Sequence, residues 1–258
     1  MTESIDKTWV NFYKELAEKL VHYQDRRKDL VQLVNDVYKT TGIKFPTLES
    51  DNVLIDIDPF TIFALFNKAS MRDINKTKIL TEFASYFDIK SKVPTSFDSI
   101  PTVNNQNATY YNFKGYRNED DIDKLWGLFI NALDYAKKPS EDNKVKFIES
   151  FNENIIKLGN GNSKLTGGLY WIAPETFVNF DKRSTWYIFD TYKLPRELIK
   201  AQLKPNGKLT GEQYLELIDM VKAILNSGET SINNFIDLSY EAWRYSDRKS
   251  TRLNSSHS

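Results

Sequence analysis

The sequence contains no cysteine, only two histidines, and no long run of apolar residues. The absence of cysteine excludes disulfide scaffolds, thiolate nucleophiles and cysteine-based zinc sites. No stretch approaches the roughly 18–20 uncharged apolar residues that a membrane-spanning helix needs. The first residues, MTESIDKTW, also lack the basic and apolar blocks of a signal peptide. We therefore expect a cytoplasmic protein that does not interact with membranes.

Glycine and proline are scarce as well, at 10 and 8 of 258 residues, which argues against a disordered or loop-dominated chain. Hydrophobic residues make up 40% of the sequence and aromatic residues 14%, so the chain can bury a sizeable core. A chain of this length is sufficient for one large domain or two small ones.

The end of the chain is predicted not to be native sequence. Residues 247–257 read DRKSTRLNSSH, which is the translation of a widely used sequencing adapter, so we exclude 247–258 from the functional argument. This tail carries three basic residues and one acidic residue; without it, 32 basic residues face 34 acidic ones, a net charge of −2. A reading frame that runs into adapter is interrupted, so we expect the natural protein to continue past Ser246.

Apolar residues recur at helical spacing along most of the chain. Capping signals sharpen several boundaries: Asp58 with Pro59 starts one helix, Thr210 with Gln213 forms a capping box, and Gly42 ends another. The fold is therefore predicted to be mainly α, an α-rich α+β fold with a few short strands around 102–113. The periodicity within 168–190 fits either strand or short helices, and both interpretations stay open. The predicted helices cover about 7–23, 25–42, 59–66, 73–87, 119–133, 140–155, 210–225 and 235–245.

Residues 91–118 differ in character, since they contain two prolines and an asparagine-rich stretch. We predict a seam between two subdomains here, with a helical part over 1–90 and a second part over 95–228. A further break is expected at the glycines of GNGNSKLTGG, residues 159–168, which we interpret as a flexible connection. Its spacing does not fit the phosphate-binding pattern Gly-x4-Gly-Lys-Ser/Thr.

The densest aromatic block, residues 169–192, carries the candidate binding site. Interleaved rings, amides and cations can hold an unstacked base, because rings stack on its faces while amide and carboxylate groups bind its edge. The alternative is that these rings only fill the core. The base-binding candidates are Tyr170, Trp171, Asn179, Asp181, Lys182, Arg183, Trp186 and Tyr187. The phosphate-contact candidates that follow are Lys193, Arg196 and Lys200.

Neither a catalytic residue nor a metal site is predicted. The acidic clusters at 51–58 and 119–123 lack the order of a calcium-binding loop, and capping of helix N-termini accounts for them. Without the tail, His22 is the one remaining histidine. A single histidine gives no support to a zinc site or to a serine nucleophile activated by histidine.

Five segments in order carry a family resemblance. They are WVNFYKELAEKLVHYQDRRKDL, FPTLESDNVLIDIDPFTIFALFNKA, FDSIPTVNNQNATYYNFKGYRNEDDIDKLWGLFINAL, GLYWIAPETFVNFDKRSTWYI and LSYEAW. Together they resemble the N-terminal region of McrB-like AAA+ proteins, the motor subunits of modification-dependent (type IV) restriction systems. The resemblance covers nearly all of residues 9–246.

The resemblance implies a target-recognition role in phage defence, with DNA as the partner, either unmodified or carrying modified cytosine. It further implies that residues 229–246 begin a linker to a missing AAA+ motor, which would use GTP or ATP with Mg and assemble into a homo-oligomeric ring. No cofactor is expected in the fragment itself, and a separate nuclease subunit is the implied second partner. The alternative function is a helical protein–protein interaction module of a phage-defence complex that binds no nucleic acid.

Overall fold

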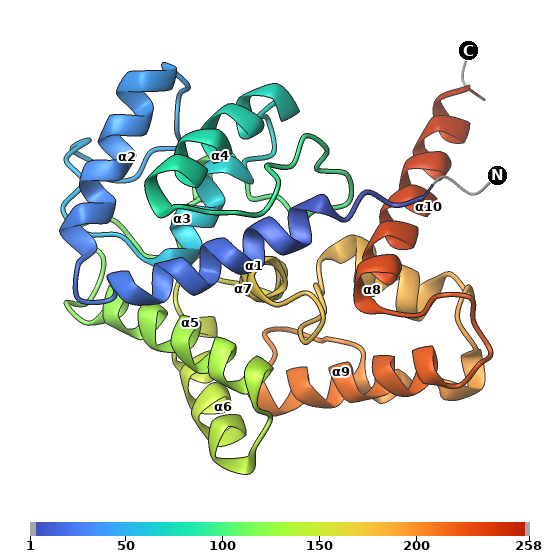
Figure 1. Cartoon of the computed structure of the whole chain (residues 1–258). Coiled ribbons are helices and arrows are strands. Elements are labelled where there is room, and N and C mark those ends of the chain that lie inside the picture. The colour runs from blue at the N-terminus through green and yellow to red at the C-terminus, as the bar shows by residue number, and fades with distance from the viewer. Residues whose placement is uncertain (1–3, 256–258) are drawn as a thin grey trace.

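The computed structural model describes residues 4–255, which fold into helices joined by loops (Figure 1). Within these residues no helix is both long and apolar enough to cross a bilayer. The α-helices are α1 (Thr8–Leu20), α2 (Arg27–Thr41), α3 (Pro59–Phe66), α4 (Asp73–Phe87), α5 (Asp121–Lys137), α6 (Glu141–Ile155), α7 (Asn162–Ile172), α8 (Lys182–Asp190), α9 (Gly211–Asn226) and α10 (Phe235–Ser255). Four single-turn 3-10 helices lie at Val21–Tyr23, Asn105–Asn107, Arg196–Leu198 and Ala201–Leu203.

The capping signals in the sequence mark the helix ends that the structure has. Asp58 Oδ1 accepts hydrogen bonds from the backbone N–H groups of Phe60 and Thr61, at 2.8 and 3.1 Å, and so starts α3. The hydroxyl of Thr210 and the side chain of Gln213 bind each other's backbone N–H at the start of α9. The mainly α fold predicted from the sequence is confirmed.

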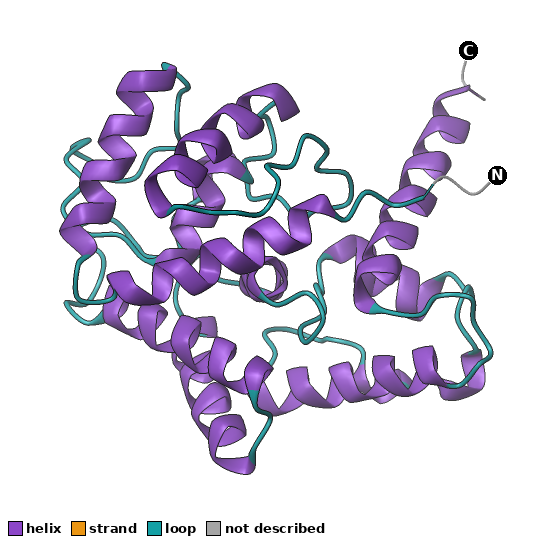
Figure 2. Ribbon diagram, viewed as in Figure 1, coloured by secondary structure: helices purple, strands orange, loops and turns teal. Residues whose placement is uncertain are grey.

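The short strands predicted around 102–113 are wrong, and of the two interpretations of 168–190, strand or short helices, the structure has the helices. Figure 2 draws the described residues as helix and loop, and their strand-like pairing is limited to one parallel bridge between Lys68 and Val103. Residues 168–190 contain the last five residues of α7 and all of α8, with a loop between them. From Leu165 to Ile172 every residue of α7 is buried, so the apolar pattern has no polar face that would identify it as a helix.

The flexible connection predicted at the glycines 159–168 ends earlier than expected, because α7 already begins at Asn162. Gly168 lies inside this helix, and a Cβ atom there would stand 2.9 Å from both Phe60 Cδ1 and Tyr110 Oη. This glycine therefore serves close packing between α7 and its neighbours rather than loop flexibility.

The buried hydrophobic side chains form one connected cluster that extends from Trp9 in α1 to Ala242 in α10. Helix α7 lies at its centre, packed against α1, α3, α5 and α6, while α8 packs against α10 (Figure 1). The predicted seam contributes to this core: Tyr110 is buried and donates a hydrogen bond to Lys164 O at 2.8 Å. The division into subdomains near residue 90 stays a prediction.

Candidate nucleic-acid interface

The cap and the N-terminal half of α8 bring four of the predicted base-binding residues to one surface hollow of about 560 Å³. These are Asp181, Lys182, Arg183 and Trp186, and residues 99–102 line the same hollow. Asp181 caps the helix, since its Oδ1 accepts a hydrogen bond from the Ser184 backbone N–H at 2.7 Å. The cap fixes the residue at which α8 begins. It therefore also fixes the direction in which Lys182, Arg183 and Trp186 extend from the helix.

A second hollow of about 660 Å³ adjoins the first, and both are lined by Ser163, Lys182 and Trp186. Its other walls are the start of α7, which contributes Lys164, and the loop that contains Lys208. The two hollows together form what we call the Trp186 groove, with the half-buried indole of Trp186 between them.

One ring of α10 supports the indole. Trp186 stacks on Tyr245 with ring centroids 5.5 Å apart and an interplanar angle of 24°. Lys249 also places its Nζ 4.8 Å from the Trp186 ring centroid. Because Lys249 belongs to the tail that we predict to be adapter-derived, we assign the indole's native support to Tyr245 alone.

The groove is basic although the chain as a whole carries no net charge. Lys182 and Arg183 are exposed and form no ion pair within the described part of the chain. Lys164 is more deeply placed: its Nζ donates hydrogen bonds to Asn107 Oδ1 at 3.0 Å and to Thr109 O, and burial lowers its pKa to about 8. A groove with these cations is suited to an anionic ligand.

The acidic side chains at the groove do not offset these cations fully. Asp190 forms an ion pair with Lys204, with 2.8 Å between Oδ1 and Nζ. The Oδ1 atom of Asp181 is occupied by the cap, and its Oδ2 atom accepts no hydrogen bond within the described residues. One carboxylate oxygen thus remains available to a ligand.

Three other base-binding candidates lie in the core and take no part in the groove. The Tyr170 ring is 5.6 Å from the Trp9 ring, and Trp171 Nε1 donates to Pro101 O at 2.9 Å. Asn179 is also buried. The core-filling alternative accounts for these three side chains, because a base in the groove would not reach them.

The remaining candidates lie on other parts of the molecule, and Tyr187 is buried, with 5% of its surface exposed. Tyr187 and Lys193 line a hollow of about 770 Å³ between α8 and α10. Arg196 places its guanidinium 3.9 Å from the Tyr192 ring centroid, and Lys200 is exposed, with its backbone N–H directed to Met220 Sδ. The three phosphate-contact candidates therefore do not line the Trp186 groove.

Sequence reasoning missed Ser163, Lys164 and Lys208 as groove residues. The signal for Ser163 and Lys164 is their place in the glycine segment 159–168, although the spacing of that segment does not fit the nucleotide-binding pattern. Lys208 comes from a loop that carries no motif, and it reaches the groove because Asn162 binds that loop through Gly207 O and the Leu209 N–H, at 2.8 and 2.9 Å.

No group of three or more histidine, aspartate or glutamate side chains is placed to hold a metal ion in the described residues. In a comparison with known protein families, a family model described as a domain of unknown function (DUF8425) matches residues 9–245. Neither a search of the curated proteins nor a search of the solved structures found a match.

Proposed function

The chain belongs to the DUF8425 family, and we propose that residues 9–246 are the DNA-recognition region of a McrB-like AAA+ restriction motor. The observation that carries this proposal is the Trp186 groove, where an accessible indole lies between two hollows and beside unpaired cations. Each hollow falls within the roughly 300–1,000 Å³ that ligand sites commonly occupy.

In this proposal the groove holds an unstacked base. The indole of Trp186 supplies a stacking surface, which is worth about 1–3 kcal/mol per base. The free Oδ2 atom of Asp181 accepts from an exocyclic amino group, the contact through which carboxylates bind cytosine N4. Lys182 and Arg183 lie on the same turn and contact the adjacent phosphates.

The wider assembly is part of the same proposal. We place the protein in the cytoplasm, where it would act with a separate nuclease subunit and a ring-forming motor that uses GTP or ATP with Mg. The described residues would contribute the target contact, and nucleotide hydrolysis would belong to the motor. The modified cytosine suggested by the resemblance is the natural first ligand to test.

Binding of fluorescently labelled DNA to the chain ending at Ser246 tests the proposal, since that end removes Lys249 from the indole. Duplexes with cytosine, 5-methylcytosine and 5-hydroxymethylcytosine are compared at low salt by anisotropy. We expect Trp186→Ala to weaken binding about tenfold or more, because it removes the stacking surface. The matched control is Tyr116→Ala, a ring that is 84% exposed and lies outside the groove. Equal affinity of wild type and Trp186→Ala for every duplex would remove the groove from the proposal.

A second candidate function, a protein–protein interaction module, is favoured by one observation. The side chains of Ile156 and Leu158 are 75% and 83% exposed and follow α6 directly. Neighbouring exposed apolar residues are typical of contact surfaces when they form a patch. Salt-dependent DNA binding separates the two functions, because DNA recognition requires it and a module that binds protein alone does not.

A further inference from the structure

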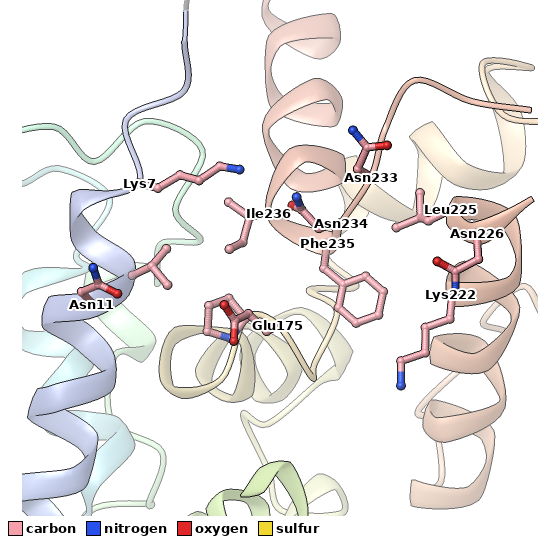
Figure 3. A pocket seen from close by; sticks show the side chains of 12 residues that line it. Lys7, Asn11, Glu175, Lys222, Leu225, Asn226, Asn233, Asn234, Phe235 and Ile236 are labelled. Carbon is pink, nitrogen blue, oxygen red and sulfur yellow. The ribbon is translucent and has the colours of Figure 1, made fainter. Parts of the chain in front are cut away.

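A separate hollow of about 460 Å³ lies between α1, α9 and the start of α10, and Pro174 and Glu175 contribute to its wall (Figure 3). It shares no lining residue with the Trp186 groove. Its polar side chains fall into two groups, those that hold the walls together and those that have no partner in the protein.

The first group fixes the shape of the hollow. Asn234 caps α10: its Oδ1 accepts from the Asp237 N–H, and its Nδ2 donates to Asp237 Oδ2, both at 2.8 Å. Lys7 forms an ion pair with Asp237, with 2.8 Å between Nζ and Oδ1. These contacts tie the segment before α1 to α10, so the hollow is preformed.

The second group consists of three amides, one cation and one carboxylate. Asn11, Asn226 and Asn233 are exposed, and their side chains make no hydrogen bond within the described part of the chain. Lys222 lies one turn before Asn226 on α9, and neither it nor Glu175 takes part in an ion pair among the described residues. Figure 3 shows these side chains around one space: Asn11 lies on α1, Lys222 and Asn226 lie on α9, and Asn233 and Glu175 lie in loops.

Beneath the amides is an apolar floor. Val10, Leu225, Phe235 and Ile236 line the hollow, each with no more than 8% of its surface exposed. An apolar side chain in this space would be removed from water against the small exposed parts of these four residues, which favours binding. The hollow therefore suits a ligand with one apolar side chain and several uncharged hydrogen-bonding groups.

From these contacts we propose that the hollow binds an extended segment of a protein partner, uncharged at this position, with an aliphatic side chain on the floor. A primary amide presents a donor and an acceptor in one plane, which matches the N–H and C=O groups of a peptide backbone. Main-chain hydrogen bonds of this kind hold extended peptides, while a pocket for the side chain selects the sequence. Lys222 and Glu175 balance each other in charge, so an uncharged segment is favoured.

A nucleotide fits this hollow less well. Phe235 is 5% exposed, so its ring offers no face for stacking. Lys222 is the one cation without a partner among the lining residues, and a phosphate there would lie near the carboxylate of Glu175. The peptide and DNA sites are therefore distinct in chemistry as well as in position.

The probe for this site is the capped tripeptide acetyl-Ala-Leu-Ala-amide, titrated into the ¹⁵N-labelled full chain and followed by NMR. We expect the side-chain NH₂ signals of Asn11, Asn226 and Asn233 to shift together and to saturate. The double variant Asn226→Ala/Asn233→Ala is expected to weaken binding at least tenfold. Asn35→Ala, an exposed asparagine on α2, is the matched control and should bind the probe like wild type.

Two further titrations decide between ligand classes. Uridine is expected to leave the three amide signals in place. Trp186→Ala is expected to leave the shifts caused by the tripeptide unchanged, so peptide binding at this hollow can be distinguished from DNA binding at the Trp186 groove. The proposal is overturned if the tripeptide shifts none of the three signals at saturating concentration. It is equally overturned if uridine shifts them and the tripeptide does not, or if the double variant binds the tripeptide as well as wild type.

Discussion

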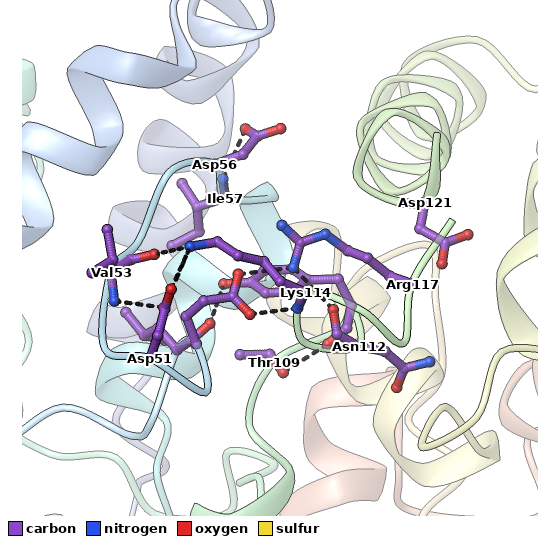
Figure 4. A network of polar contacts seen from close by, with 12 residues as sticks. Asp51, Val53, Asp56, Ile57, Thr109, Asn112, Lys114, Arg117 and Asp121 are labelled. Atoms are coloured by element: carbon purple, nitrogen blue, oxygen red, sulfur yellow. Dashed lines mark hydrogen bonds and ion pairs between the residues drawn. The ribbon is translucent and has the colours of Figure 1, made fainter. Parts of the chain in front are cut away.

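Glu49 and Arg117 form an ion pair with 2.8 Å between Oε2 and Nη1, and the Glu49 side chain is fully buried (Figure 4). The other carboxylate oxygen of Glu49 accepts from the Lys114 backbone N–H at 2.7 Å. Arg117 also donates to Asn112 O at 3.1 Å and lies over the Tyr111 ring, 5.2 Å from its centroid. This ion pair joins two irregular segments, the loop before α3 and the loop before α5.

Replacing Arg117 by methionine is expected to lower the free energy of unfolding by about 3–5 kcal/mol, because it leaves the buried carboxylate of Glu49 without its charge partner. Urea unfolding followed by circular dichroism measures the change. Adding Glu49→Gln to Arg117→Met should recover part of the loss, since the buried charge is then absent. The control is Arg26→Met, which breaks an ion pair with Asp29 whose side chains are 60% and 45% exposed. That change is expected to cost no more than about 1 kcal/mol, and equal losses at the two arginines would contradict the prediction.

Two helical glycines give opposite expectations for the same substitution. Gly168→Ala places a methyl group 2.9 Å from Phe60 Cδ1 and Tyr110 Oη, so it should destabilise the protein by about 1–3 kcal/mol through overpacking. Gly127 lies in α5 with no atom within 4 Å of the added Cβ, so Gly127→Ala should stabilise by about 0.5–1 kcal/mol. Thermal unfolding of both variants against wild type checks the pair. A stabilised Gly168→Ala protein would show that the packing around α7 is looser than the structure has it.

The helices could be predicted where a polar face or a cap marks them. Asp58 and Thr210 start α3 and α9 as their local sequence indicates, because capping depends on atoms within three residues. Helix α7 could not be told from a strand, because residues 165–172 are all buried and their sequence lacks the polar face on which such predictions depend.

The residues of the candidate site show the same limit of prediction from local sequence. Trp171 and Trp186 stand 15 positions apart in one aromatic block, yet Trp171 is 1% exposed and Trp186 is half-buried at the groove. The difference arises from partners that are distant in sequence: Pro101 accepts the hydrogen bond of Trp171, whereas Trp186 packs on Tyr245. Local sequence gives the type of side chain, but its exposure depends on long-range packing.

Burial gives Asp58 an unusual effect on stability. Desolvation raises the pKa of its carboxyl to about 6 in the folded protein, although Thr61 and the α3 N–H groups hydrogen-bond to it. An aspartate in an unfolded chain has a pKa of about 3.9. Between these values the folded state binds more protons than the unfolded state, so this group stabilises the fold below about pH 4. The contribution is lost as the pH rises to about 6, and it amounts to about 3 kcal/mol.

Asp58→Asn tests this dependence, since asparagine retains the capping oxygen but does not ionise. Urea unfolding at intervals from pH 4 to pH 7 measures the free energy of unfolding of both proteins. The wild-type value should fall relative to that of the variant up to about pH 6, and above this pH the difference between them should stay constant. Taking the difference between the two proteins removes the contributions of other carboxylates, such as Asp51 and Asp88, whose lowered pKa values act in the opposite direction. A constant difference across this range would contradict the prediction.

Removing the cations of the Trp186 groove should change the salt dependence of DNA binding, whereas removing its indole should not. On duplex DNA, the logarithm of the association constant falls as the logarithm of the salt concentration rises. Each phosphate contact adds about 0.9 to the magnitude of this slope. Lys182→Ala/Arg183→Ala is therefore expected to lower the magnitude of the slope by about 1.8. Trp186→Ala should weaken binding at every salt concentration without changing the slope, because stacking releases no counterions. The control is Lys28→Ala/Lys39→Ala, which removes two exposed lysines of α2 that lie outside the groove. If the control lowers the slope as much as the groove variant does, the contact with DNA is a diffuse attraction to basic surface, and the groove has no special part in it.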